Sequence, residues 1–155
     1  SVTFVKKRRA PHAGRGTLIS IAIIAILADQ LSKWAAILYL GENLQLIPGL
    51  LWLEVVKNSG IAFSLPIPNI FMLIATPLIL FAIWFIMKKH LSGKISNLAL
   101  GLIIGGGSGN YIDRILSGAV TDFIATPFWP TFNVADTLLV CGAFLLIIFH
   151  GRISE

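Results

Sequence analysis

The chain is poor in the residues that form disulfides, metal centres and nucleophilic catalytic sets. It has one cysteine, Cys141, and three histidines among 155 residues. One cysteine cannot form a disulfide within the chain, and no cluster of cysteine and histidine of the kind that binds zinc is present. We therefore expect neither a structural metal nor a cofactor.

Charge is also scarce. Only 12% of the residues are charged while 56% are hydrophobic, and the mean hydropathy is +0.86. Such a composition is typical of a chain that crosses a bilayer, which takes about 20 mainly apolar residues per helical crossing. Four segments qualify. We predict a single integral membrane domain with an all-α core and transmembrane helices over 17–40, 69–88, 95–116 and 134–150.

Lysine and arginine collect in three places: before the first predicted helix, between the second and third, and after the fourth. With four crossings, all three clusters lie on one side, which the positive-inside rule identifies as cytoplasmic. Both termini, including a basic tail over 1–16, are then cytoplasmic, and the net charge of +5 reflects topology and anionic lipid, not nucleic-acid binding. The residues are Lys6, Lys7, Arg8, Arg9, Arg15, Lys88, Lys89, Lys94 and Arg152.

Two connections, 41–68 and 117–133, then face outward. In the first, LLWLEVV (50–56) and GIAFSL (60–65) are short apolar runs separated by the turn signal KNSG, which predicts a small hairpin or sheet as a β platform on the outer surface. In the second, Pro127 and Pro130 each remove a backbone donor and favour a loop.

Acids inside apolar segments are costly and are candidates for function by default. Asp113 lies about 18 residues, or about 27 Å, into the third helix, and Asp136 falls in the first turn of the fourth. With Asp122 between them and Asp29 in the first helix, the acids point to one outer pocket. The same layer holds four further polar residues, Asn58, Asn110, Arg114 and Asn133.

Several of these residues also have a structural interpretation. Asp113 could form an ion pair with Arg114, and Asn133 could cap the fourth helix. Asp29 and Lys33, one turn apart, could neutralise each other. The GGGSG run at 105–109 favours close helix packing over a phosphate site.

Asp122 and Asp136 differ because no basic residue adjoins either one in sequence. Two carboxylates close together away from bulk water cannot both ionise cheaply, so they share a proton. Such a pair can activate a water as base and protonate a leaving group as acid. Since all three histidines fall on the cytoplasmic side, a serine or cysteine set would have to span the bilayer.

The motifs DQLSK (29–33), VKNSGIAF (56–63), GGGSGNYIDR (105–114), VTDFI (120–124) and FNVADT (132–137) follow one another along most of the chain. In these residues the sequence resembles bacterial lipoprotein signal peptidase, also called signal peptidase II. Slight departures occur at Thr137, where the family often has serine, and in GGGSGN.

The resemblance implies a four-helix aspartic endopeptidase of the bacterial cytoplasmic (inner) membrane, with its active site near the outer face. It implies a substrate, a prolipoprotein cleaved just before its diacylglyceryl cysteine, a monomeric enzyme in contact with membrane lipids, and inhibition by globomycin-type cyclic peptides. By similarity, Asp122 and Asp136 are catalytic. The supporting residues are Asn58, Gly60, Asn110, Asp113, Arg114, Asn133 and Ala135, with Asp29 and Lys33 in a structural role.

Two other classes of function remain open at this point. A small transporter could use Asp29 or the acid pair as a proton or cation site, although such sites commonly lie near the midplane and here the acids gather at one surface. A membrane scaffold would leave the polar cluster unexplained.

Overall fold

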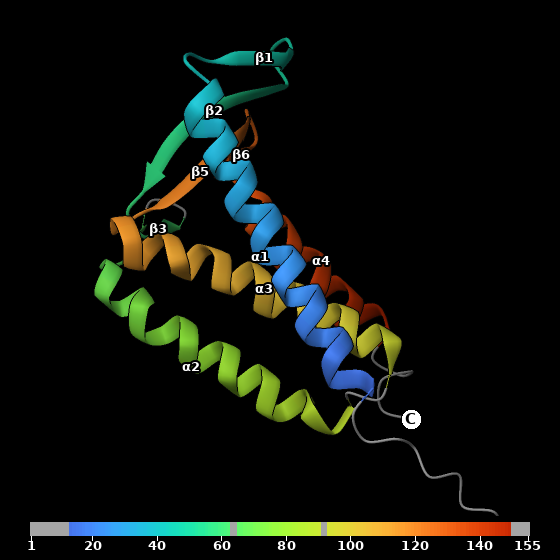
Figure 1. Cartoon of the computed structure of the whole chain (residues 1–155). Helices are drawn as coiled ribbons and strands as arrows, with labels where there is room; N and C mark the ends of the chain where they lie inside the picture. The colour runs from blue at the N-terminus through green and yellow to red at the C-terminus, as the bar shows by residue number, and fades with distance from the viewer. Residues whose placement is uncertain (1–12, 63–64, 91–92, 150–155) are drawn as a thin grey trace, which may run out of the picture.

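The computed structural model describes residues 13–62, 65–90 and 93–149. Most of the expected basic tail (1–12), part of the GIAFSL run (63–64) and the chain from 150 onward, with Arg152, lie outside these ranges. Four long helices are present: α1 (Ala13–Tyr39), α2 (Asn69–Met87), α3 (Lys94–Ser117) and α4 (Val134–Ile148), with a short 3-10 turn η1 (Lys88–His90) after α2. All four correspond to the segments predicted from hydropathy (Figure 1).

Helix α3 is the central element, because it contacts α1, α2 and α4. Its glycines allow the backbones to approach closely. A Cβ atom on Gly105 would collide with Ala25 of α1, and one on Gly106 would lie 2.6 Å from the carbonyl oxygen of Ala135 in α4. The interpretation of the glycine run as a close-packing surface is therefore confirmed.

The outer faces of the helices are apolar. Helix α2 buries none of its 19 residues within the protein. Segment Arg15–Tyr39 of α1 and all of α2 are long and apolar enough to cross a membrane, and α4 is a shorter apolar helix. Polar side chains of α3, in contrast, are buried among the other elements. This distribution is the reverse of a soluble bundle and is that of a membrane protein.

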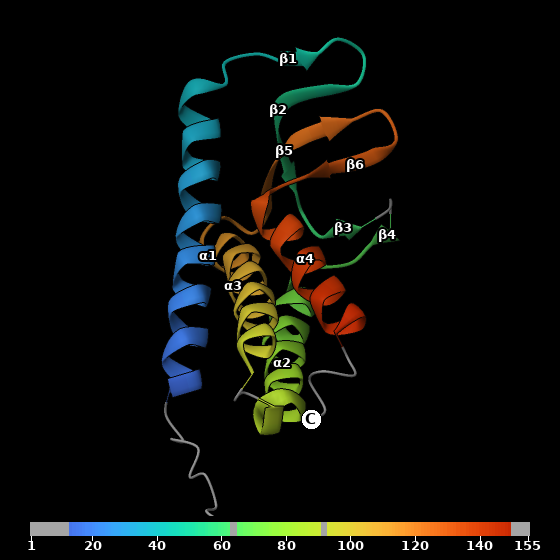
Figure 2. The ribbon, with the colours of Figure 1, turned by 90° about the vertical axis from the view of Figure 1, so that its right-hand side faces the viewer.

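An antiparallel sheet lies beyond the end of the helices at which α1 ends and α4 begins (Figure 2). Its order is β1 (Leu44–Ile47), β2 (Leu51–Asn58), β5 (Val120–Thr126) and β6 (Trp129–Phe132). A second, two-stranded sheet pairs β3 (Ile61–Ala62) with β4 (Leu65–Pro66). The expected small β platform is thus present.

Two details of the sequence prediction were wrong. The KNSG turn does not join a hairpin, because Lys57 and Asn58 continue β2 and pair with β5, while β2's hairpin partner is β1. The connection over 117–133 is not a loop but the β5–β6 hairpin. Pro130 is tolerated there since β6 is an edge strand, where a missing N–H leaves no ladder bond unmade.

Close packing of α3 and α4 gives a first prediction. A Cβ on Gly142 would lie 2.7 Å from the carbonyl oxygen of Ala99, so Gly142→Val should lower the free energy of unfolding by about 1 to 3 kcal/mol. Thermal unfolding in detergent micelles measures this. The control is Cys141→Val at the exposed neighbouring position, and equal stability of the two variants would contradict the packing.

Candidate active site

Asp122 lies on β5 and is almost fully buried. Two amides hold its carboxylate: Asn58 Nδ2 of β2 donates to Oδ2 at 3.1 Å, and Asn133 Nδ2 donates to Oδ1 at 2.7 Å. The pairing of Val56 with Asp122 across β2 and β5 brings Asn58 to this position. The register of the sheet therefore fixes the first acid.

Asp136 is the third residue of α4 and belongs to a capping box. Asn133 Oδ1 accepts from the N–H of Asp136 at 2.9 Å, and Asp136 Oδ2 accepts from the N–H of Asn133 at 3.2 Å. The capping interpretation of Asn133 is confirmed, and the same side chain also binds Asp122. The two residues that cap the start of α4, Asn133 and Asp136, are therefore also part of the acid site.

A second amide joins the two acids. Asn110 Nδ2 of α3 donates to Asp136 Oδ1 at 2.8 Å, while Asn110 Oδ1 accepts from Asn133 Nδ2 at 3.0 Å. Because that oxygen also accepts from Lys33 Nζ at 2.9 Å, the amide of Asn110 can face Asp136 only through its nitrogen. Asp122, Asn133, Asn110 and Asp136 form one connected hydrogen-bond network.

A buried ion cluster lies behind this network. Lys33 Nζ is 2.7 Å from Asp29 Oδ2, which confirms the expected pair within α1, and 3.0 Å from Asp113 Oδ2. The expected pairing of Asp113 with Arg114 was wrong. Adjacent residues on a helix do not face each other, so Asp113 turns toward α1 while Arg114 turns toward the cavity described below.

Three small residues allow these contacts. A Cβ on Gly109 would collide with the Asp29 carboxylate. Gly60 has φ +111°, and its N–H donates to Asn58 Oδ1 at 3.1 Å, which orients that amide toward Asp122. Ala135 is fully buried, and its N–H donates to Asp29 Oδ1 at 2.9 Å.

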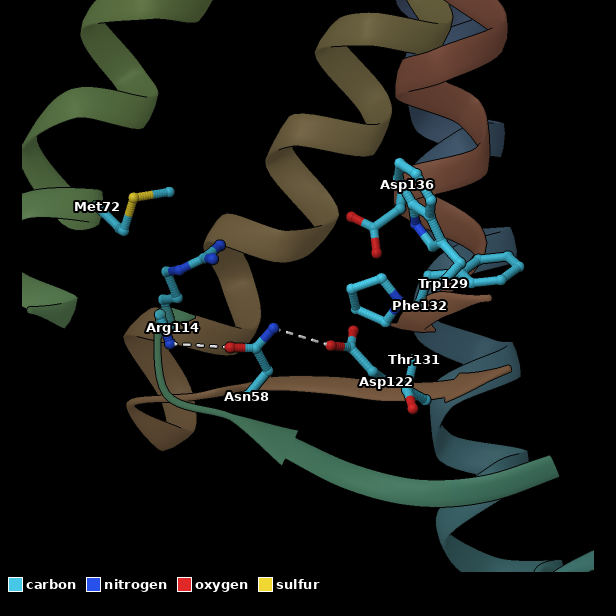
Figure 3. A pocket seen from close by; sticks show the side chains of 10 residues that line it. Asn58, Met72, Arg114, Asp122, Trp129, Thr131, Phe132 and Asp136 are labelled. Carbon is cyan, nitrogen blue, oxygen red and sulfur yellow. Dashed lines mark hydrogen bonds between the residues drawn. The ribbon is translucent and has the colours of Figure 1, made fainter. Parts of the chain in front are cut away.

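Both acids point into a cavity of about 230 Å³ (Figure 3). Arg114 and Met72 stand on the wall opposite Asp136, so α2 also contributes to the site. The guanidinium of Arg114 is held by its Nη1, which donates to the carbonyl oxygen of Asn110 at 3.4 Å. Its buried Nε has no hydrogen-bond partner among the described residues. The lining residues are Asn58, Gly60, Met72, Arg114, Asp122, Trp129, Pro130, Thr131, Phe132 and Asp136.

Sequence reasoning missed Gln30 and Met72. Gln30 Nε2 donates to Asp113 Oδ1 at 2.9 Å and to the carbonyl oxygen of Gly109 at 3.1 Å, which ties α1 to α3. Its position beside Asp29 in the DQLSK motif was a usable signal. Met72 carries no such signal, because its place in the cavity depends on how α2 packs.

The electrostatics of the cavity favour a proton on Asp122. Burial, which is the main cause, and the nearby Asp136 charge together raise the pKa of Asp122 to about 6. The hydrogen bond from Asn58 acts in the opposite direction.

The described residues contain no group of three or more His, Cys, Asp or Glu side chains placed to hold a metal.

Comparisons with known proteins point in one direction. Residues 21–151 match the family model described as "Signal peptidase (SPase) II". The chain is 36% identical over 140 residues to the lipoprotein signal peptidase of Listeria monocytogenes serotype 4a (strain HCC23), covering 85% of this chain and 90% of that protein. It is 36% identical over 151 residues to that of Chlorobaculum tepidum, covering 86% and 93%.

A solved structure described as a bacterial membrane enzyme, determined by the in meso method at 2.3 Å resolution, has the same fold. Its TM-score is 0.79, with 32% sequence identity and 90% of each chain covered.

The hydrogen bond from Asn58 leads to a second prediction. Asn58→Ala removes a donor that favours the charged carboxylate, so the pKa of Asp122 should rise above about 6. A pH titration of carboxyl ¹³C signals, assigned with Asp122→Asn, measures the shift. Asn43→Ala, an exposed amide outside the cavity, serves as control, and an unchanged titration in Asn58→Ala would contradict the assignment.

Proposed function

The chain belongs to the signal peptidase II family, and from this premise we propose that it is an aspartic endopeptidase whose catalytic pair is Asp122 and Asp136. As a member of this family it is a membrane protease that removes the signal peptide from prolipoproteins. The observation that carries the proposal is that two acids, one from β5 and one from α4, enter one cavity and are joined through Asn133 and Asn110.

In the proposed mechanism the pair holds one proton, which resides on Asp122 because burial raises its pKa to about 6. Asp136, as carboxylate, takes a proton from a water, and the water oxygen forms a bond to the carbonyl carbon of the scissile peptide. The C–N bond then breaks as the leaving nitrogen takes a proton from the pair. One water is consumed, and no covalent enzyme intermediate forms.

Other cavity residues have supporting roles in this proposal. The Arg114 guanidinium, whose buried Nε has no partner in the described part of the chain, is a donor for a backbone carbonyl of the substrate. Asn58 and Asn133 hold Asp122, with Gly60 orienting Asn58. Trp129 and Phe132 cover one side of the cavity and limit access of water. A globomycin-type cyclic peptide would compete for the same cavity, and nothing in the mechanism needs a second copy of the chain.

We further propose that all four helices cross the membrane and that the cavity lies near its outer face. Support comes from the charge distribution: Arg15, Lys88, Lys89 and Lys94 lie at helix ends away from the sheet, as cytoplasmic residues should (Figure 2). The substrate would then arrive laterally, with its signal helix in the bilayer and the peptide bond before its diacylglyceryl cysteine at the level of the sheet.

Replacement of either acid tests the proposal. Asp122→Asn and Asp136→Asn keep the volume of the side chain but remove the proton exchange, so cleavage of a purified diacylglyceryl-modified prolipoprotein should fall by about 10²- to 10⁴-fold. Glu42→Gln, an exposed acid outside the cavity, should cleave at the wild-type rate. A folded Asp122→Asn or Asp136→Asn variant with near wild-type activity would refute the dyad.

The shared proton also predicts the pH dependence. Loss of that proton inactivates the pair, so kcat/KM should decrease above an apparent pKa of about 6, a value that belongs to the pair. Initial rates with the same substrate, from about pH 5 to 9, measure the profile. A flat profile over that range would be inconsistent with a shared proton.

A further inference from the structure

The Lys33 ammonium contacts three side chains of the site: it donates hydrogen bonds to Asp29 and Asn110 and forms an ion pair with Asp113. Nζ lies 2.7 Å from Asp29 Oδ2, 2.9 Å from Asn110 Oδ1 and 3.0 Å from Asp113 Oδ2. Lys33 and Asp29 are essentially inaccessible to solvent, at 3% and 0%. We call Asp29, Lys33 and Asp113 the ion triad.

Each carboxylate of the ion triad also binds one backbone N–H, and the two N–H groups have corresponding positions. Asp113 Oδ2 accepts from Thr121, the residue before Asp122, at 2.9 Å. Asp29 Oδ1 accepts from Ala135, the residue before Asp136, at 2.9 Å. The lysine thus connects two acids that each hold the chain one residue ahead of a catalytic aspartate.

We propose that Lys33 is a positioning residue that sets the relative placement of Asp122 and Asp136 through the ion triad. This inference rests on the proposed function of the two aspartates. It goes beyond a stabilising role for Lys33, because it links the ammonium to the geometry of the two reacting carboxylates.

The side-chain network reinforces the backbone contacts. Asn110 Oδ1, held by Lys33, also accepts from Asn133, whose amide binds Asp122, and Asn110 Nδ2 binds Asp136. Lys33 therefore reaches both aspartates by two routes, one through the main chain and one through amides. Catalytic geometry tolerates little error, since a displacement of about 1 Å can cost about 100-fold in rate.

Stability alone does not account for the ion triad. Burying an ion pair carries a desolvation penalty, and well-packed apolar residues of similar volume often serve as well or better. Here two carboxylates share one ammonium, with Gln30 Nε2 as the additional donor, at 3.2 Å from Asp29 Oδ2 and 2.9 Å from Asp113 Oδ1. An arrangement this costly is explained if it fixes the two backbone N–H groups.

Lys33→Met is the first test, because methionine keeps much of the length of the side chain and removes all three donors. We expect kcat to fall by about 100-fold with KM changed by less than about twofold, since the cavity lining stays intact. The matched control is Lys57→Met, which removes an ammonium bonded to the Thr121 hydroxyl at 2.7 Å and leaves the Thr121 N–H in place. A Lys33→Met enzyme with kcat near that of Lys57→Met overturns the proposal.

A double variant separates positioning from structure. In Lys33→Met two buried carboxylates lose their ammonium, and adding Asp113→Leu removes one of them, so thermal stability should recover toward that of the wild type. Adding Asp113→Leu also removes the acceptor of the Thr121 N–H, so kcat should stay low. Recovery of kcat together with stability would show that Lys33 only supports the fold, and would overturn the proposal.

If Lys33→Met does not fold, the single variant Asp113→Leu tests the positioning role. It leaves the Lys33–Asp29 pair in place and removes the acceptor of the Thr121 N–H, together with the contacts of Asp113 to Lys33 and Gln30. We therefore expect kcat to fall by at least about tenfold at constant KM. An unchanged kcat overturns the proposal. Asp122→Asn, assayed in the same series, distinguishes the catalytic dyad from the positioning role of Lys33. Normal cleavage by Asp122→Asn refutes the dyad itself. Normal cleavage by Asp113→Leu together with an inactive Asp122→Asn refutes only the positioning role.

Discussion

The ammonium group of Lys33, bonded to two carboxylates among apolar helices, is the interaction on which the rest of the site depends. It links α1 to α3, and through Asp29 and Asp113 it reaches the N-terminus of α4 and the start of β5. In a low-dielectric environment such contacts are strong when complete and costly when broken. The positions of Asp122 and Asp136 are therefore fixed by the hydrogen bonds and ion pairs around Lys33.

Glycine makes that network possible. The carboxylate of Asp29 can approach α3 only because Gly109 has no side chain, and Gly105, Gly106 and Gly142 let the neighbouring helices close on α3 in the same way. Polar groups are thus concentrated in the centre of the molecule while α2 and the outer faces stay apolar. This division suits a protein whose surroundings are lipid, since each buried polar group must find its partner inside the protein.

Hydropathy and acid placement predicted the four helices and the gathering of Asp29, Asp113, Asp122 and Asp136 in one layer, because segment length and residue depth are local properties. The family motifs supplied the proposed roles of single residues. The predictions from the sequence were wrong where a residue distant in the chain determines the local structure or the ion pair. Val120–Thr126 is a strand because β2 pairs with it. Asp113 forms its ion pair with Lys33 and not with its neighbour Arg114, because the geometry of α3 directs the Asp113 side chain toward α1. Tertiary packing decides both.

Whether Asp122 and Asp136 act as a pair is tested most directly by a crystal structure of the enzyme with a peptide analogue whose scissile amide is replaced by a secondary alcohol. That hydroxyl stands where the attacking water and the tetrahedral carbon would be. We expect this one hydroxyl to form hydrogen bonds with the carboxylates of both Asp122 and Asp136, at about 2.5 to 3.0 Å. A hydroxyl bound to neither carboxylate, or to only one with the other turned away, would contradict a shared catalytic role.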